Sequence, residues 1–359
     1  MQKSKACHLD VGAQHTTNHD DHHRRMVSIS IDQSCTASDT VEVNIPHQQT
    51  KRSFKKINSN NVHGHNIFLG ENDMQQGSTL PSYISWEGED VSDGSTFTFV
   101  QDQNNNMAGS LVDLTNQEVY QFYNQHDGTM AVTITKSEDF APEIDPVDES
   151  PDEKTWEMWS SNNDNRQRHL EAVQESNIND TTGFRLQESL RIQHDEIIES
   201  KESRKLSDDG SVMDVMVVWT PKAECRRSGL SEGCTLTSQT ESNMLSLVNL
   251  AITETNNAYT ASGVDSQLLL VHAYRHPDYV ETSFNTALSE LRSGGVSDVN
   301  TNRATYGADI VALLIDDSQY CGLGYVGPRI DLMYSVTGWN CATGYYSFGH
   351  EIGHNLGEF

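Results

Sequence analysis

Two histidines, His350 and His354, stand four residues apart near the end of the sequence, and Glu351 directly follows the first. Residues i and i+4 share one face of an α-helix, so both imidazoles can reach a single metal ion. Zinc suits this pair, because imidazole nitrogens fill part of its tetrahedral shell and leave a position for water. Glu351 would lie beside that water as a general base. The alternative is a helix that carries two core histidines by coincidence.

Residues beside the histidines favour the metal site. Gly357 comes three residues after His354, where a glycine can end the helix with a positive φ and turn the chain back toward the ion. Ile352 and Leu356 supply an apolar helix face. The pattern His-Glu-x-x-His-x-x-Gly is the start of a longer signature, which continues with two residues and a third histidine.

Residues 1–359 do not reveal the third zinc ligand of this site. The sequence ends at Phe359, one position before the third histidine of the longer signature. Two histidines leave two positions of the ion to water, and one missing ligand costs several of the roughly 10–16 kcal/mol seen for structural zinc sites. From residues 1–359 alone we therefore expect weak zinc binding and little or no activity. Glu358 is a poor substitute, because it follows the turn glycine immediately.

Length, charge and composition narrow the class of protein. The 359 residues suggest about two domains. A net charge of −28 argues against a nucleic-acid partner, which requires a basic face. Hydrophobic residues make up only 35% of the chain and are unevenly spread, which predicts some disorder. No run approaches the roughly eighteen apolar residues of a membrane span, and the first eight residues do not begin a signal peptide.

The cysteines indicate whether the protein resides in an oxidising or a reducing compartment. The sequence contains Cys7, Cys35, Cys225, Cys234, Cys321 and Cys341. No Cys-x-x-Cys pair is present, which argues against a structural zinc finger. Cys225 with Cys234, and Cys321 with Cys341, are close enough in sequence to close loops as disulfides, although sequence does not determine the pairing. Disulfides would imply an oxidising compartment, whereas the missing signal peptide points the other way.

The chain before residue 211 divides into three segments by composition. Residues 1–66 are polar and histidine-rich, and we predict a disordered tail with isolated strands at most over 27–31 and 41–45. Residues 67–140 alternate like the hairpins of a small antiparallel β segment, clearest at Thr-Phe-Thr-Phe-Val over 96–100. Residues 141–210 form an acidic linker. Its Arg204-Lys205 pair is either a processing site or ordinary linker charge.

Residues 211–359 change character and predict a folded α/β domain. Apolar runs at 214–220, 268–271 and 309–315 indicate buried strands. A long amphipathic helix ending at Gly263 and a second helix near 284–291 lie between them. This order predicts a mostly parallel sheet with helices packed on it. The glycine-marked run 321–326 is either an edge strand that pairs with an extended peptide or a plain surface hairpin.

Residues 214–357 resemble the adamalysin/reprolysin-like branch of the metzincin zinc peptidases. Several stretches occur in the same order as in that family, and the last is the most specific: Val-Val-Trp-Thr-Pro over 217–221, Glu-Thr-Asn-Asn-Ala-Tyr over 254–259, Tyr-Gly-Ala-Asp-Ile-Val-Ala-Leu-Leu over 306–314, Cys-Gly-Leu-Gly-Tyr over 321–325, Cys341, and Phe-Gly-His-Glu-Ile-Gly-His-Asn-Leu-Gly over 348–357. The similar part is about two fifths of the chain.

The resemblance implies an α/β (α+β) metzincin-like catalytic domain with a mostly parallel twisted sheet and an active-site helix. It implies one Zn²⁺ held by His350 and His354, Glu351 as the catalytic base and Gly357 as the turn residue. Leu323 and Gly324 would lie on the edge strand that holds the substrate backbone. The small antiparallel β segment before it would be prodomain-like. Some prodomains of this family place a free cysteine on the zinc, but neither Cys7 nor Cys35 has a recognisable context for this.

The function that follows from the resemblance is zinc-dependent hydrolysis of peptide bonds in protein or peptide substrates, in a secreted or secretory-pathway protein. The alternative is an inactive metzincin-like interaction or scaffold protein that lacks the third zinc ligand. A gluzincin-type peptidase, with a distant glutamate ligand, would leave Gly357 unexplained. The substrate, the cleavage preference and the oligomeric state are not indicated by the residues.

Overall fold

The computed structural model describes residues 7–15, 26–31, 38–45, 50–58, 61–62, 82–147 and 212–357, with side chains over 38–44, 51–57, 82–147 and 212–357. These residues belong to one compact unit of the chain. The second unit, Asp148–Ser211, lies outside them and contains the Arg204-Lys205 pair. None of the described helices combines the length and apolar character needed to cross a membrane.

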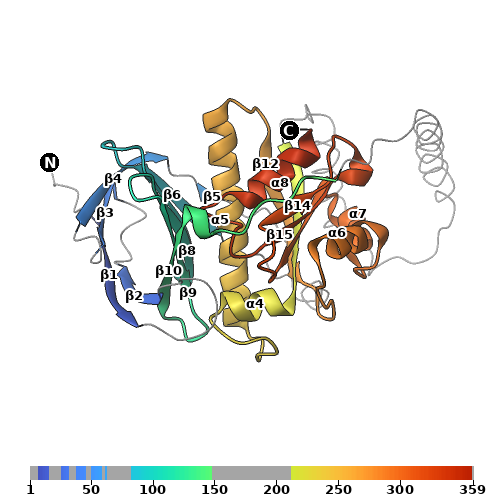
Figure 1. Cartoon of the computed structure of the whole chain (residues 1–359), viewed down its shortest axis with the longest axis horizontal. Helices are drawn as coiled ribbons and strands as arrows, with labels where there is room; N and C mark the ends of the chain where they lie inside the picture. Colours follow the sequence, from blue (N-terminus) through green and yellow to red (C-terminus); the bar gives the residue numbers. More distant parts are fainter. Residues whose placement is uncertain are drawn as a thin grey trace, which may run out of the picture. The chain divides into compact units, whose positions relative to one another are not determined.

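A ten-stranded sheet forms from the first part of the chain (Figure 1, blue to green). Its strands are β1 (Cys7–His15), β2 (Met26–Ile31), β3 (Thr40–Ile45), β4 (Thr50–Asn58), β5 (Asn61–Val62), β6 (Tyr83–Glu89), β7 (Thr96–Asp102), β8 (Met107–Asp113), β9 (Glu118–Asn124) and β10 (Met130–Lys136). The spatial order is β4-β3-β1-β2-β10-β9-β8-β7-β6-β5, and β4 also pairs with β6, so the sheet closes on itself. Only the β1–β3 pair is parallel among the described pairings.

Strand alternation gives this sheet two buried faces. Phe97 and Phe99 point to the enclosed side, where Trp86 stacks on Phe99 with ring centroids 5.5 Å apart. Val100, on the opposite face, packs in a second cluster with Leu250 of helix α5 (Ser238–Ser262). Successive side chains of a strand point to opposite faces, so one strand serves both clusters. The sheet and α5 therefore form one packed body.

The prediction of a disordered tail over residues 1–66 is wrong for the residues that the structure describes there. Strands β1 to β5 lie in this stretch and are members of the ten-stranded sheet, not isolated strands. The sequence is polar, and its strands are held by pairings with distant partners, such as β4 with β6. Such pairing depends on neighbours that local composition does not reveal. The remaining segment boundaries stay predictions.

A five-stranded sheet forms the second part. Its strands are β11 (Val212–Trp219), β12 (Gln267–Arg275), β13 (Ile310–Ile315), β14 (Gly322–Gly324) and β15 (Tyr334–Gly338), in the order β12-β11-β13-β15-β14. All pairs are parallel except β14 with β15. The helices here are α4 (Pro221–Arg227), α5, α6 (Phe284–Ser293), α7 (Val299–Tyr306) and α8 (Ser347–Leu356), and short 3₁₀ turns lie at Ser137–Asp139 and Ile330–Leu332.

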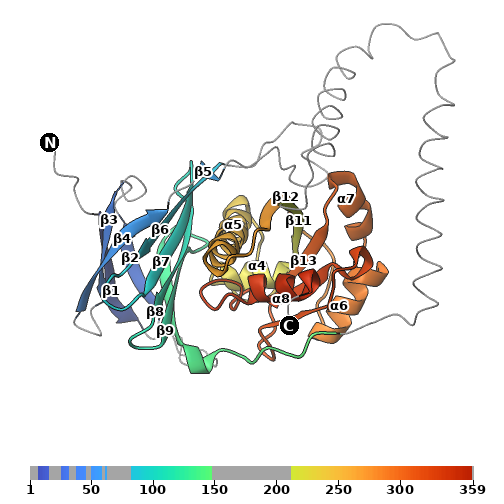
Figure 2. The same cartoon turned by 90° about the horizontal axis from the view of Figure 1, so that it is seen from above.

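Strand β13 shows that the five-stranded sheet lies between two hydrophobic cores. Ile310, Ala312 and Leu314 face a core shared with α5 and α8, whereas the residues between them face a core shared with α6 and α7. Every residue of the strand is fully buried. Figure 2 shows α5 on one side of the sheet and α6 and α7 on the other. An unbroken apolar run is what a strand covered on both faces requires.

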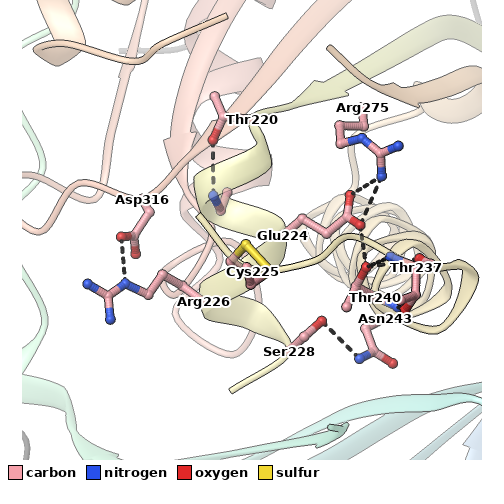
Figure 3. Close-up of a disulfide and its surroundings, with 12 residues drawn as sticks. Thr220, Glu224, Cys225, Arg226, Ser228, Thr237, Thr240, Asn243, Arg275 and Asp316 are labelled. Atoms are coloured by element: carbon pink, nitrogen blue, oxygen red, sulfur yellow. Dashed lines mark hydrogen bonds and ion pairs between the residues drawn. A yellow bond between two sulfur atoms is a disulfide. The ribbon is translucent and has the colours of Figure 1, made fainter. Parts of the chain in front are cut away.

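Helix α4 is joined to its surroundings by a disulfide and by one buried carboxylate (Figure 3). Cys225 and Cys234 are bonded, nine residues apart. Glu224, beside the disulfide, accepts hydrogen bonds from Trp219 Nε1 at 2.7 Å and Thr240 Oγ1 at 2.6 Å, and pairs with Arg275 at 3.0 Å. Helix α4 is thereby tied to β11, α5 and β12.

Candidate metal centre

Helix α8 carries the histidine pair and ends where the sequence predicts. It begins after Tyr346 and finishes at Gly357, whose φ is +95°. The Gly357 amide donates to His354 O at 3.0 Å, which closes the last turn. A Cβ on Gly357 would lie 3.3 Å from Gly327 O, in a conformation that side chains rarely adopt. Glycine at this position lets the chain leave the helix sharply.

The two histidines converge. The Nε2 atoms of His350 and His354 are 3.0 Å apart, and the ring planes are inclined by 79°. Two nitrogens about 2.0–2.1 Å from one zinc ion in tetrahedral geometry would be about 3.4 Å apart. The pair therefore fits a shared ion with only a small adjustment. Partial desolvation of the ring, and then the neighbouring His354, lower the pKa of His350, which favours the neutral form that binds metal.

These two side chains are not joined by a third His, Cys, Asp or Glu in metal-binding geometry within the described residues. His354 is buried and His350 is exposed, so the pair has one side in the core and one toward the surface. Of the ligands that the resemblance implies, the described structure brings these two together.

Glu351 is fully buried on the same helix, and neither of its carboxyl oxygens has a hydrogen-bond partner of normal geometry among the described residues. Burial is the largest cause that raises its pKa, to about 9, and the facing Glu143 carboxylate adds to it. A buried carboxyl without partners is costly and is typical of a functional site.

Two glycines of β14 make room for that carboxyl. A Cβ on Gly322 would lie 2.3 Å from Glu351 Oε1, and one on Gly324 would lie 2.8 Å from the Glu351 carbonyl oxygen. Any side chain at these positions would push the strand away from α8. The glycine-marked run in the sequence is therefore explained by this close approach.

The predicted substrate-binding residues Leu323 and Gly324 lie on β14, the edge strand of the five-stranded sheet. The Leu323 side chain is fully buried in the core, so the backbone is what the strand offers outward. The Gly324 carbonyl accepts a hydrogen bond from Val147 N at 2.9 Å, and Val326 N donates to Val147 O at 3.0 Å. The outer edge of β14 is thus paired with residues that precede the second unit.

Glu143 is a site residue that the sequence analysis placed in the acidic linker. Its carboxylate accepts a hydrogen bond from Ser347 Oγ at the start of α8 and faces Glu351. Nothing in the acidic, proline-marked run distinguishes this glutamate from Asp145 or Asp148. Its position depends on the pairing with β14, which only the fold reveals.

Asn355 holds α8 against the strands beneath it and was also not predicted. Its fully buried side chain donates from Nδ2 to three carbonyl oxygens, those of Tyr325, Leu332 and Tyr334, at 2.7, 3.2 and 3.1 Å. A disulfide between Cys321 and Cys341 further links β14 to the segment before α8. Both predicted disulfides of this part are therefore present.

Residues 245–358 match the metallo-peptidase family M12B, described as reprolysin-like. This part of the chain is reprolysin-like. The match includes the whole His350–Gly357 segment and most of α5, so the family resemblance and the geometry of the histidine pair agree. The family's metal-dependent peptidases imply a metal ion at this centre, and the two imidazoles fit one.

The curated relatives are similar over part of this chain. A peptidyl-Asp metalloendopeptidase of Stenotrophomonas maltophilia is 44% identical over 117 residues, which are 31% of this chain and 28% of that protein. One of Pseudomonas aeruginosa is 31% identical over 163 residues, 40% of this chain and 24% of that protein. The chain thus covers about a quarter of each relative. Among solved structures, metalloproteinase-II of Bacteroides fragilis aligns over 89% of this chain and 80% of its own, with 10% identity and a TM-score of 0.41.

Proposed function

We propose that this chain carries the catalytic part of a zinc-dependent endopeptidase with a glutamate base. The observation that supports it most is the convergence of the His350 and His354 Nε2 atoms, 3.0 Å apart, beside the buried Glu351. His350 and His354 would hold the ion. Zinc, when bound, supplies Lewis-acid polarisation of the scissile carbonyl and of water.

The other steps belong to residues of the chain. In its ionised form, Glu351 accepts the proton of the attacking water and then delivers it to the leaving amine. The backbone of Leu323 and Gly324 binds an extended peptide by adding a strand to the sheet edge. Gly357 ends the helix that carries the two histidines. Protein or peptide segments that can become extended are therefore the proposed substrates.

The relatives' name suggests which peptides to try. We propose peptides that contain aspartate, compared with matched peptides in which asparagine replaces it. With excess Zn²⁺ the protein should cleave the aspartate peptide slowly, because the described residues bring only two histidine ligands to the ion, and cleavage should stop when a chelator removes the metal. If the wild-type protein binds zinc near unit stoichiometry and Glu351→Gln hydrolyses peptides equally well, the proposed role of the base is wrong.

A second candidate is an inactive interaction or scaffold protein built on the same fold. It is favoured by the presence of only two converging metal-binding side chains within the described residues. The two candidates differ in one measurement, since a scaffold would show no zinc-dependent hydrolysis while it remains folded and binds peptides.

We also propose an oxidising compartment, the secretory-pathway lumen or the outside of the cell. Cys225–Cys234 and Cys321–Cys341 are both bonded, and such bonds persist where thiols are not kept reduced. Alkylation of the protein from its source, followed by mass spectrometry, should find these four cysteines blocked before reduction. The ten-stranded sheet takes the prodomain-like role in this proposal.

A further inference from the structure

Residues 340–346, here called the entry loop, lie between β15 and helix α8. Gly344 and Tyr346 in this loop both have a left-handed backbone, with φ of +73° and +67°. A tyrosine in this conformation is strained and persists only where its surroundings hold it. The His350 amide donates to Tyr346 O at 3.0 Å, so the first turn of α8 is built directly on the strained residue. The conformation of the entry loop therefore sets the direction in which α8 carries His350.

Glu254 of α5 holds the middle of the entry loop. Its buried carboxylate accepts a hydrogen bond from the Gly344 amide at 2.7 Å and another from Ser110 Oγ of β8. A Cβ on Gly344 would lie 2.5 Å from Val119 Cγ1, so the loop backbone lies directly against the ten-stranded sheet. An ionised carboxyl accepts stronger hydrogen bonds than a neutral group does. One side chain thus joins the entry loop, α5 and the sheet.

The carbonyl groups of the same loop are held by Gln121 of β9. Its Nε2 donates to Asn340 O at 2.9 Å and to Thr343 O at 2.8 Å. Both N–H groups of the glutamine amide are then used, and the Gln121 side chain is buried. The Gly344 amide and these two carbonyls are bonded to different elements, α5 and β9, so the loop is fixed from two directions.

Helix α8 also lies closely against α5. A Cβ on Gly349 would lie 2.8 Å from Thr255 Oγ1, which shows how near the two helices approach. Tyr259 Oη donates to Gly349 O at 3.1 Å. Thr255 follows Glu254 directly in α5, and Tyr259 lies about one turn later. One stretch of α5 therefore contacts both the entry loop and the residue that precedes His350.

We propose that Glu254 is a positioning residue for the metal centre: by holding the Gly344 amide it fixes the entry loop, and the loop directs His350 toward His354. The identity of the ion rests on the proposed function, whereas the hold on the loop rests on the contacts above. Two ligands bind one ion well when they are held in place before the ion arrives, because ordering them afterwards reduces the affinity. The coupling is reciprocal, so a bound ion should also hold the loop more firmly.

The first experiment measures amide hydrogen exchange in the full chain without added metal. Glu254→Leu removes the acceptor of the Gly344 amide, whereas the side-chain carbonyl oxygen of Glu254→Gln can still accept this bond. We expect the Ser347 and His350 amides, which donate to the entry loop, to exchange about tenfold faster in Glu254→Leu. Glu254→Gln should restore the wild-type rates. Wild-type rates in Glu254→Leu would overturn the proposal.

Gln239→Leu is the matched control. Gln239 Nε2 donates to Asn106 Oδ1, beside β8, at 2.9 Å, about four turns of α5 away from Glu254. The control should exchange like wild type. If it accelerates exchange as much as Glu254→Leu does, any loosening of α5 from the sheet has this effect, and the specific role of Glu254 is wrong. If Glu254→Leu does not fold, Gln121→Leu, which frees two carbonyls of the entry loop, is measured in its place. The same acceleration is expected there, and wild-type exchange would overturn the proposal.

Metal binding gives a second readout, which a purely structural role would not change. Co²⁺ is titrated into each protein and followed by its visible absorption. The affinity should fall about tenfold in Glu254→Leu and stay within about twofold of wild type in Glu254→Gln and Gln239→Leu. In the wild type, excess Zn²⁺ should slow exchange of the Gly344 amide more than that of the Met107 amide, which donates to Asn124 Oδ1 within the sheet. Equal slowing of the two amides would mean that the ion stabilises the whole fold, and would overturn the coupling.

Failure of this inference and failure of the proposed function give different results, because neither exchange nor metal binding requires turnover. If Glu254→Leu loosens the loop and weakens Co²⁺ binding, but the wild type hydrolyses no peptide with Zn²⁺, the positioning role holds and the peptidase activity is wrong. If zinc-dependent hydrolysis occurs and Glu254→Leu matches wild type in exchange and in Co²⁺ affinity, the peptidase holds and the positioning role is wrong.

Discussion

Two fully buried glutamates of the five-stranded part lie in opposite kinds of surroundings. Glu224 accepts hydrogen bonds from Thr240 and Arg275 (Figure 3) and a further one from Trp219 Nε1, so both of its carboxyl oxygens are paired. Glu351 has the same burial, but neither oxygen has a partner of normal geometry. A satisfied buried carboxylate holds elements together, whereas an unsatisfied one lowers stability. The difference separates a carboxylate that joins elements of the fold from one to which the proposed function gives a chemical role.

The largest expected effect lies at the unsatisfied glutamate. If the proposed function is correct, Glu351→Gln should lower zinc-dependent peptide hydrolysis by about 10²–10⁴-fold, because it removes the proposed base. The free energy of unfolding should not fall, since no hydrogen bond of normal geometry to Glu351 is lost and the repulsion between the Glu351 and Glu143 carboxylates is removed. Peptide assays with urea denaturation on the same sample measure both. A variant that loses stability in parallel with activity would show that Glu351 is structural, like Glu224.

Glu224→Ala should lower the free energy of unfolding, in contrast to Glu351→Gln. Arg275, Trp219 and Thr240 would lose their shared acceptor, and the loss of one partner from a buried pair costs about 3–5 kcal/mol. Because Arg275 is 28% exposed, we expect the lower end, about 3 kcal/mol. Urea denaturation gives this value, with exposed Glu232→Ala as the control. A cost below about 1 kcal/mol would remove the contrast between the two sites.

A third buried glutamate sharpens the comparison because it is partly satisfied. Glu254 of α5 accepts hydrogen bonds from Ser110 of β8 and from the Gly344 amide, at 2.7 Å for the latter. Burial raises its pKa to about 7, these two bonds lower it, and the charge of Glu87 raises it again. Tyr346 is the other titratable group that interacts with it. Glu254 thus stands between Glu224 and Glu351 in the number of its partners.

The pH dependence follows from that pKa. Between the ordinary value of 4.5 and about 7, the folded protein holds a proton that the unfolded chain has lost, so stability falls as pH rises through this window. The loss attributable to Glu254 is about 3 kcal/mol between pH 4 and pH 8. Glu254→Gln should lack it, so the wild-type slope should be the steeper one in urea denaturation. Parallel stability curves for wild type and Glu254→Gln would contradict the assignment. Glu87→Gln should reduce the slope without removing it.

The parts of this protein that were predictable depend on local spacing. The i, i+4 histidines predicted α8 and the convergence of its two imidazoles, Gly357 predicted the end of that helix, and the apolar run 309–315 predicted a strand covered on both faces. The contributions of Glu143 and Asn355 were not predictable, because each depends on a segment remote in sequence. Glu143 is positioned by pairing with β14, and Asn355 by carbonyls that precede it by 21 to 30 residues.

The same reason explains the error over residues 1–66. A stretch such as 7–15 has the composition of a solvated tail, and its strand exists because β2 and β3 pair with it on both sides. Hydrogen bonding to neighbours can hold a polar strand that buries little apolar surface of its own. Composition predicts disorder only where no partner strand is available.

The smallest expected effect concerns Asn355, which holds α8 against the strands beneath it. Asn355→Ala should cost about 2 kcal/mol, because the carbonyls of Tyr325, Leu332 and Tyr334 lose a buried donor. Asn104→Ala, at an exposed turn, is the matched control and should change the free energy of unfolding by less than about 0.5 kcal/mol. Zinc affinity should fall with Asn355→Ala, because β14 and α8 are no longer held in register around His354. An unchanged affinity together with the loss of stability would show that the histidine pair is positioned by the helix alone.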